Sequence, residues 1–67
     1  MKQITVNGEP RDVAEGTTLA QLVEALGQAP QALATAVNGE FIARDARATV
    51  HLAEGDAVFT FQPITGG

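Results

Sequence analysis

Near its start the chain alternates between polar and apolar side chains with the period of a β-strand. The run 2–6 alternates in this way, Asn7-Gly8 has the composition of a tight turn, and a short polar segment returns over 11–13. This pattern predicts a β-hairpin whose second strand lies at an edge of the sheet. The side chains expected to point into the core are those of Ile4, Val6 and Val13.

A longer apolar stripe with helical spacing follows the hairpin. Its members lie at i, i+3, i+4 and i+7, and they are Leu19, Leu22, Val23 and Leu26. Thr18 and Gln21 form a capping-box pattern at the start, and Gly27 is placed to end the helix. We therefore expect one amphipathic helix that packs a single face on a sheet.

Three more strands are expected, at 33–37, 41–43 and 57–62, with a second Asn-Gly turn between the first two. The segment 44–47 is irregular or forms one helical turn, and 49–52 is a short strand or an extended connection. This order of elements indicates an α+β fold, a mixed sheet with one helix packed across one face. The first and last strands are the most apolar, so they are expected side by side in the middle.

Length, charge and cysteine content exclude several classes of protein. With 67 residues, 45% of them hydrophobic and 18% charged, the chain is expected to form one globular domain over 1–62, followed by a flexible tail over 63–67. Its net charge of −4 argues against a nucleic-acid partner. The absence of cysteine excludes disulfides and any thiol chemistry on this chain. No stretch has the pattern of a signal peptide or a membrane span, so a cytoplasmic location is expected.

Candidate catalytic residues are scarce. His51 has no cysteine or second histidine with which to share a metal, and the acidic residues are scattered over turns and faces. The glycines do not form a phosphate-binding loop. Arg44 and Arg47 are candidates for binding an acidic surface, but solvation or salt bridges are the favoured expectation. We therefore expect no metal site, no bound cofactor and no active site within this domain.

The C-terminal residues are the strongest functional signal. Pro63 has no N–H for a β-ladder, so the last strand is expected to stop there and to release Ile64, Thr65, Gly66 and Gly67. Extended, residues 63–67 carry the terminal carboxylate roughly 17 Å from the sheet. Two glycines make this end narrow. The tail is thus suited to threading into the active site of another protein.

Taken together, these motifs resemble the ThiS family of sulfur carriers in thiamine biosynthesis, within the ThiS and MoaD group of ubiquitin-like β-grasp proteins. The resemblance covers the whole chain and rests on the helix stripe and on four further segments: 36–40, Ile42 with Arg44, 54–56 and 64–67. An aromatic residue often found after the family's arginine is absent here, where Asp45-Ala46-Arg47 stands.

The resemblance implies a carrier rather than an enzyme. In this family an E1-like partner adenylates the C-terminal carboxylate, here that of Gly67, with ATP and magnesium. The acyl-adenylate then accepts sulfur from a partner's persulfide, and the resulting thiocarboxylate supplies thiazole synthase. The free carrier is expected to be a monomer.

Three alternatives share some of these features. A molybdopterin synthase small subunit has the same fold, tail and activation, although such chains tend to be longer. A ubiquitin-like modifier would use the same adenylate to form an amide with lysine. A non-covalent β-grasp interaction domain would carry its glycines incidentally.

The last strand leaves one question open, because its alternation places Phe59 and Phe61 on one face and Val58 on the other. Hydrophobicity alone favours the phenylalanines as core residues. The family register, counted from the terminal glycines, instead places Val58 inward. It leaves Phe61, with Phe59 and Phe41, as an exposed docking patch beside the tail.

Overall fold

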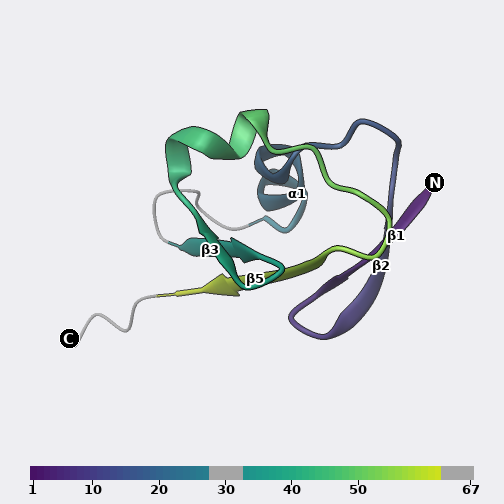
Figure 1. The fold of residues 1–67 in the computed structure, drawn as a ribbon, viewed down its shortest axis with the longest axis horizontal. Coiled ribbons are helices and arrows are strands. Elements are labelled where there is room, and N and C mark those ends of the chain that lie inside the picture. The colour runs from purple at the N-terminus through teal and green to yellow at the C-terminus, as the bar shows by residue number, and fades with distance from the viewer. Residues whose placement is uncertain (28–32, 63–67) are drawn as a thin grey trace.

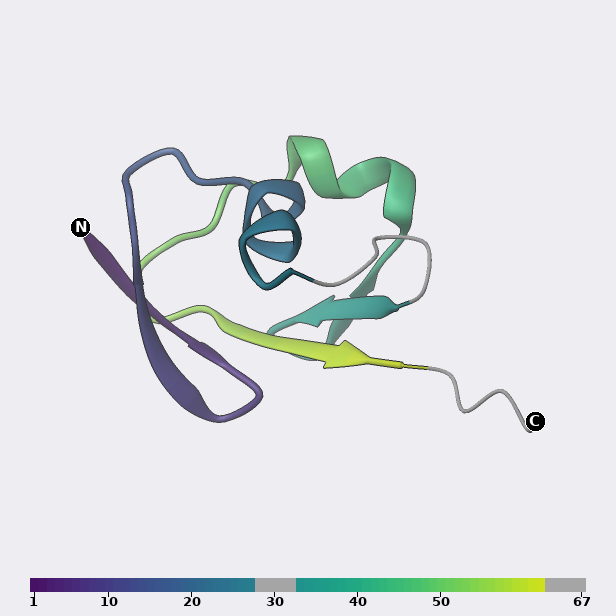
Figure 2. The same cartoon turned by 180° about the vertical axis from the view of Figure 1, so that it is seen from behind.

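Within the residues that the structure describes, five strands form one mixed sheet, and one α-helix lies across one face of it (Figures 1 and 2). The computed structural model describes residues 1–27 and 33–62. Its elements are β1 (Lys2–Val6), β2 (Glu9–Val13), α1 (Leu19–Ala25), β3 (Ala34–Val37), β4 (Glu40–Ile42), the 3-10 helix η2 (Arg44–Thr49) and β5 (Ala57–Phe61). The predicted α+β architecture is confirmed. The proposed tail, 63–67, lies outside the described residues.

The last strand occupies the middle of the sheet. The strand order is β2-β1-β5-β3-β4. β1 and β5 are parallel, with Thr5 opposite Ala57 and Val6 opposite Val58, whereas the other neighbouring strands are antiparallel. The prediction that the first and last strands lie side by side is therefore confirmed.

Both Asn-Gly pairs form the turns that their composition predicts. The φ angles are 52° at Asn7 and 86° at Gly8, and 52° at Asn38 and 83° at Gly39. A type I′ turn requires positive φ at both central residues, which asparagine tolerates and glycine adopts without strain. These turns set the register of the β1–β2 and β3–β4 hairpins.

The helix begins with the predicted capping box. The Thr18 hydroxyl accepts a hydrogen bond from the Gln21 backbone N–H at 3.2 Å, and the Gln21 side chain accepts one from the Thr18 N–H at 2.9 Å. The helix ends at Ala25, with Leu26 as its C-cap and Gly27 in the left-handed conformation at φ 75°. Local signals thus fix both ends of α1.

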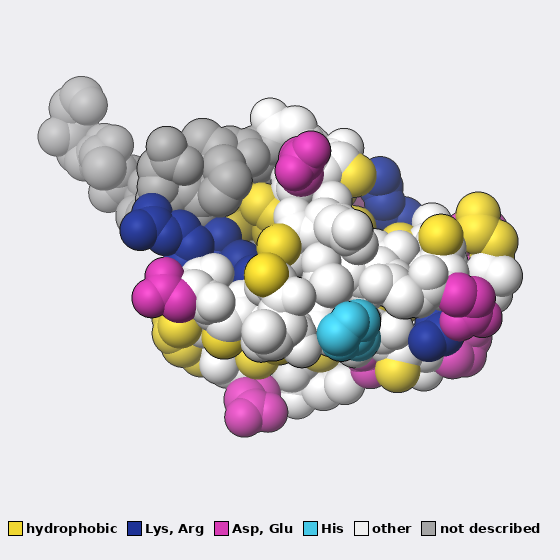
Figure 3. Space-filling view, turned by 90° about the horizontal axis from the view of Figure 1, so that it is seen from above, with side chains coloured by type: hydrophobic (Ala, Val, Ile, Leu, Met, Phe, Trp, Pro, Cys, Tyr) yellow, Lys and Arg dark blue, Asp and Glu magenta, His cyan; other side chains and the backbone are white. Residues whose placement is uncertain are grey.

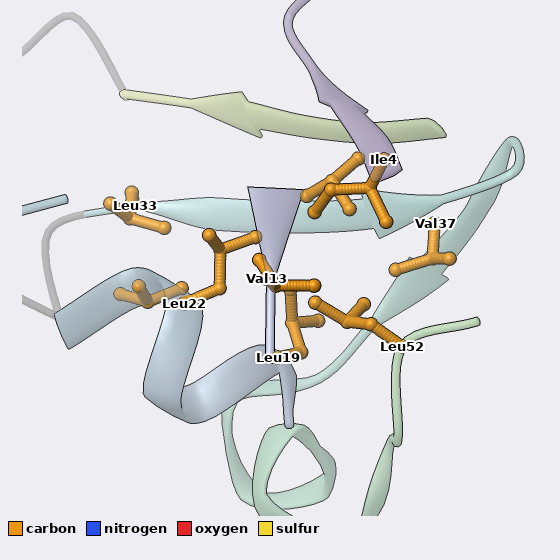
Figure 4. Packing of buried hydrophobic residues seen from close by; sticks show 9 residues of the cluster. Ile4, Val13, Leu19, Leu22, Leu33, Val37 and Leu52 are labelled. Carbon is orange, nitrogen blue, oxygen red and sulfur yellow. The ribbon is translucent and has the colours of Figure 1, made fainter. Parts of the chain in front are cut away.

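The core lies between α1 and the inner face of the sheet (Figure 4). Its members are almost fully shielded from solvent, and they are Ile4, Val13, Leu19, Leu22, Val23, Leu33, Val37, Leu52 and Val58. Val6 and Leu26 are only partly buried and pack against its margin. Most of the predicted inward residues are therefore core residues.

The connection from β4 to β5 is more regular than the sequence indicated. η2 extends over six residues, beyond the single turn considered for 44–47, and it packs against α1. The following segment forms an isolated antiparallel bridge between Thr18 and His51. It holds Leu52 in the core at 1% exposure.

The expectation that Arg47 is solvated or paired on the surface is wrong. Its side chain is 3% exposed. The guanidinium donates from Nε to the Thr35 hydroxyl at 3.0 Å and from Nη2 to the Leu33 carbonyl oxygen at 2.6 Å. The two acceptors lie 12 and 14 residues before Arg47 in the sequence, one in β3 and the other directly before it. Arg44 is exposed, as expected.

Two asparagine side chains fix the two ends of β5. At its start, Asn38 accepts the Ala57 N–H through Oδ1 and donates from Nδ2 to the Asp56 carboxylate, each at 3.0 Å. Near its end, Asn7 accepts the Thr60 N–H through Oδ1 and donates from Nδ2 to the Thr60 hydroxyl, also at 3.0 Å. The turn residues therefore hold β5 as well as their own hairpins.

These contacts predict different effects of two similar substitutions. Asn38→Asp replaces the N–H donor with an oxygen that faces the Asp56 carboxylate, and we expect a loss of about 1–2 kcal/mol in unfolding free energy at pH 7. Asn7→Asp is expected to lose less, because the Thr60 hydroxyl can donate to the new carboxylate. Urea unfolding of both variants measures the difference.

The pH dependence provides the control. Like charges in the folded Asn38→Asp variant raise its carboxyl pKa above that of the unfolded chain, so the loss is complete at neutral pH. It should disappear as the pH falls below about 4 and the carboxyls become protonated. Equal losses in the two variants, or a loss that persists at about pH 3, would contradict this explanation.

Candidate functional site

The outer face of the sheet carries large exposed aromatic side chains. Val58 faces α1 and is 0% exposed, whereas its neighbours along β5, Phe59 and Phe61, are 39% and 56% exposed. Phe41 on β4 is 68% exposed. The orientation of β5 expected from the family register is therefore correct, and the one favoured by hydrophobicity alone is wrong.

The strand register brings these three rings together. Ala36 on β3 lies opposite Phe41 on one side and Phe59 on the other, and Ala34 lies opposite Phe61. Residues directly opposite one another in a sheet project from the same face. The rings therefore share one face, and the small alanine side chains between them leave them uncovered. We call Phe41, Phe59 and Phe61 the aromatic patch.

The aromatic patch is energetically unfavourable for an isolated chain. Fully burying a phenylalanine side chain is worth about 1.5–3 kcal/mol relative to leaving it exposed. All three phenylalanines of the chain lie in the patch and none lies in the core. Clustered exposed aromatic side chains are typical of surfaces that bind another protein.

The aromatic patch adjoins the end of the described chain. Phe61 is the last residue of β5, and the exposed Gln62 follows it. The predicted tail residues Ile64, Thr65, Gly66 and Gly67 continue from this point and lie outside the described residues. Their threading into a partner stays a prediction, as does the docking role of the aromatic patch.

The described residues show little that could perform chemistry. Across 1–27 and 33–62, no group of three or more histidine, cysteine, aspartate or glutamate side chains is placed to hold a metal ion. The histidine side chain, cyan in Figure 3, lies exposed on the side that carries α1 and η2. On that side hydrophobic side chains are dispersed among polar and acidic ones (Figure 3). No helix within the same residues is long and apolar enough to cross a membrane.

The burial of Arg47, near the end of β5, was not predicted from the sequence. Burial, reinforced by the neighbouring Arg44 guanidinium, lowers the pKa of Arg47 from its ordinary value. Thr35, which accepts its Nε hydrogen bond, is 0% exposed and itself donates to the Ile42 carbonyl oxygen at 3.0 Å. Arg47 thereby links η2 to β3 and, through Thr35, to β4. The charge of Arg47 and its position in the sequence did not predict this hydrogen-bond network.

Proteins of known role resemble this chain in sequence. It is 34% identical over 65 residues to the sulfur carrier protein ThiS of Escherichia coli, covering 97% of this chain and 98% of that protein. It is also 37% identical over 65 residues to a thiazole synthase of Magnetococcus marinus. The chain spans about a fifth of that protein, since the match covers 20% of its length.

Solved structures agree with the sequence matches. The crystal structure of the thiamine biosynthesis protein ThiS from Geobacter metallireducens superposes with a TM-score of 0.83 at 34% identity, covering 97% of this chain and 99% of that one. A solution structure of a thiamine biosynthesis protein from the same organism gives a TM-score of 0.79, with 97% and 87% covered. The model of the ThiS family matches residues 4–67. The chain, with its β-grasp fold, therefore belongs to the ThiS family.

Proposed function

We propose that this chain is a sulfur carrier that supplies sulfur for thiazole formation in thiamine biosynthesis. The observation that carries the proposal is the ThiS family match, which runs through the body of the domain and includes Gly66 and Gly67. The full-length resemblance to the ThiS protein of Escherichia coli supports the same role. In this proposal the chain is a co-substrate of partner enzymes and has no active site of its own.

The proposed chemistry takes place at the carboxylate of Gly67. A carboxylate oxygen is a poor leaving group, so acyl transfer requires activation. An E1-like partner, with ATP and magnesium, joins the carboxylate to AMP and releases pyrophosphate. Sulfur from a persulfide donor then attacks the acyl carbon and AMP leaves. A thiol reduces the resulting acyl disulfide and frees the thiocarboxylate.

The receiving partner in this proposal is thiazole synthase. The Magnetococcus marinus thiazole synthase contains a stretch that resembles this chain over 65 residues, which supports a functional link between the two kinds of protein. The ATP-dependent steps occur in the activating partner. We place the free carrier in the cytoplasm, and we propose that it is a monomer. With a net charge of −4, it is expected to bind proteins rather than nucleic acids.

The aromatic patch has a specific part in this proposal. Docking of its three rings on a partner would remove apolar surface from water while residues 63–67 extend from the adjacent end of β5. Positioning of this kind raises the effective concentration of the carboxylate at the nucleotide. The aromatic patch thus supplies binding free energy, and Gly67 supplies the reacting group.

Mass spectrometry of the intact chain tests the proposed function directly. Incubation with a ThiS-activating E1-like enzyme, ATP, magnesium and a sulfide source should increase the mass by about 16 Da, as sulfur replaces oxygen at the activated acyl carbon. Deletion of Gly67 should abolish the gain without lowering the melting temperature, because the core lies within residues 4–58. An unchanged mass for the wild-type chain, with the Escherichia coli carrier loading in parallel, would contradict the proposal.

The role of the aromatic patch is tested by Phe61→Ala. The ring is 56% exposed, so the melting temperature should change little, whereas kcat/KM for adenylation should fall about tenfold or more, as for an interface hot spot. Val58→Ala is the matched control on the inner face of the same strand. It should lower the melting temperature by opening a cavity beside α1. Unchanged adenylation of Phe61→Ala would remove this ring from the docking surface.

A further inference from the structure

Arg47 lies at a position from which it can control the end of β5. Its guanidinium donates to the carbonyl oxygen of Leu33, which directly precedes β3, and to the hydroxyl of Thr35, the second residue of β3. Between them is Ala34, which pairs with Phe61, and Thr35 itself pairs with Thr60. The arginine therefore holds the part of β3 that pairs with the last residues of β5.

The network extends to the far side of β3. While the Thr35 hydroxyl accepts from Arg47, it donates to the Ile42 carbonyl oxygen on β4 at 3.0 Å. Thr35 is 0% exposed and Leu33 is 5% exposed, so water cannot readily replace a lost donor at either residue. Strands β3 and β4 are thus fixed to η2 near the end of β5, after which residues 63–67 follow in the sequence.

Burial of a cation is a costly way to fill this position. Even buried ion pairs can often be replaced by apolar side chains of similar volume with no loss of stability. The planar guanidinium differs from such side chains because it holds two acceptors in one fixed geometry. The arrangement therefore favours a role in fixing the shape of this end of the sheet over a role in stability alone.

We propose that Arg47 is a positioning residue for sulfur loading: by fixing the start of β3, it fixes the end of β5 and so the direction in which the C-terminal residues leave the domain. This inference rests on the proposed function. In this proposal Arg47 acts through Leu33 and Thr35, and it has no part in the chemical step itself. Its contribution is to the orientation of the carboxylate once the aromatic patch has docked.

The test combines local amide exchange with steady-state loading kinetics. Arg47→Met keeps an apolar stem and removes the donors, so exchange at the amides of Ala34 and Phe61 should accelerate by about tenfold or more. The Asn38 amide donates to Ala57 at 2.8 Å at the other end of the same strand pair, and its exchange should not change. Arg44→Met removes the same charge from an exposed side chain and should leave all three amides unchanged.

Loading kinetics separate positioning from stability. In Arg47→Met, kcat for thiocarboxylate formation should fall about tenfold or more while KM for the carrier changes little, because the aromatic patch remains available for docking. Arg47→Lys restores the charge without the planar fork and should recover only part of the loss. If Arg47→Met does not fold, Thr35→Val removes the bridging hydroxyl with nearly the same shape, and the same local pattern is expected.

Two results would overturn the inference. One is exchange that accelerates equally at both ends of the β3–β5 pair, which would make Arg47 a general stabilising residue. The other is local loosening with an unchanged kcat. In both cases the wild-type chain still gains sulfur. A wild-type chain that gains no mass would instead overturn the proposed function, so the two failures are distinguishable.

Discussion

One helix can cover only one face of a five-stranded sheet, and the rest of this structure follows from which face that is. The helix stripe of Leu19, Leu22 and Val23 packs on the side of the sheet that carries Ile4 and Val58. Since side chains alternate along a strand, this choice places Phe59 and Phe61 on the opposite face. The domain is therefore stabilised by medium-sized aliphatic side chains, and its aromatic side chains are left exposed on the outer face.

The same constraint explains which parts of the fold could be predicted. Helix α1 and both Asn-Gly turns depend on residues within a few positions of one another, so periodicity and turn composition identified them correctly. The orientation of β5 did not follow from hydrophobicity, because the face with Val58 and Thr60 points inward and the more hydrophobic face, with Phe59 and Phe61, points outward. It became predictable only from the spacing between Val58 and the terminal glycines in a recognised family.

Arg47 shows where local reasoning fails. A charged residue in an irregular segment is expected to be exposed, yet this side chain is buried because Leu33 and Thr35, at and just before β3, offer acceptors. The spacing of residues in the sequence does not predict this contact between Arg47 and the acceptors at Leu33 and Thr35. The terminal residues are the opposite case, since Gly66 and Gly67 were identified as functional candidates from the sequence alone, and the role proposed for them depends on a partner protein.

The central claim is that the aromatic face presents the C-terminus to an activating enzyme, and NMR of the ring signals tests it most directly. The chain contains three phenylalanines, all in the aromatic patch, and one histidine, exposed on the helix-bearing side. Titration of chain labelled at these rings with an unlabelled ThiS-activating enzyme should broaden or shift the signals of Phe41, Phe59 and Phe61 and leave His51 unchanged. Binding that perturbs His51 and spares the three phenylalanine rings would contradict the account.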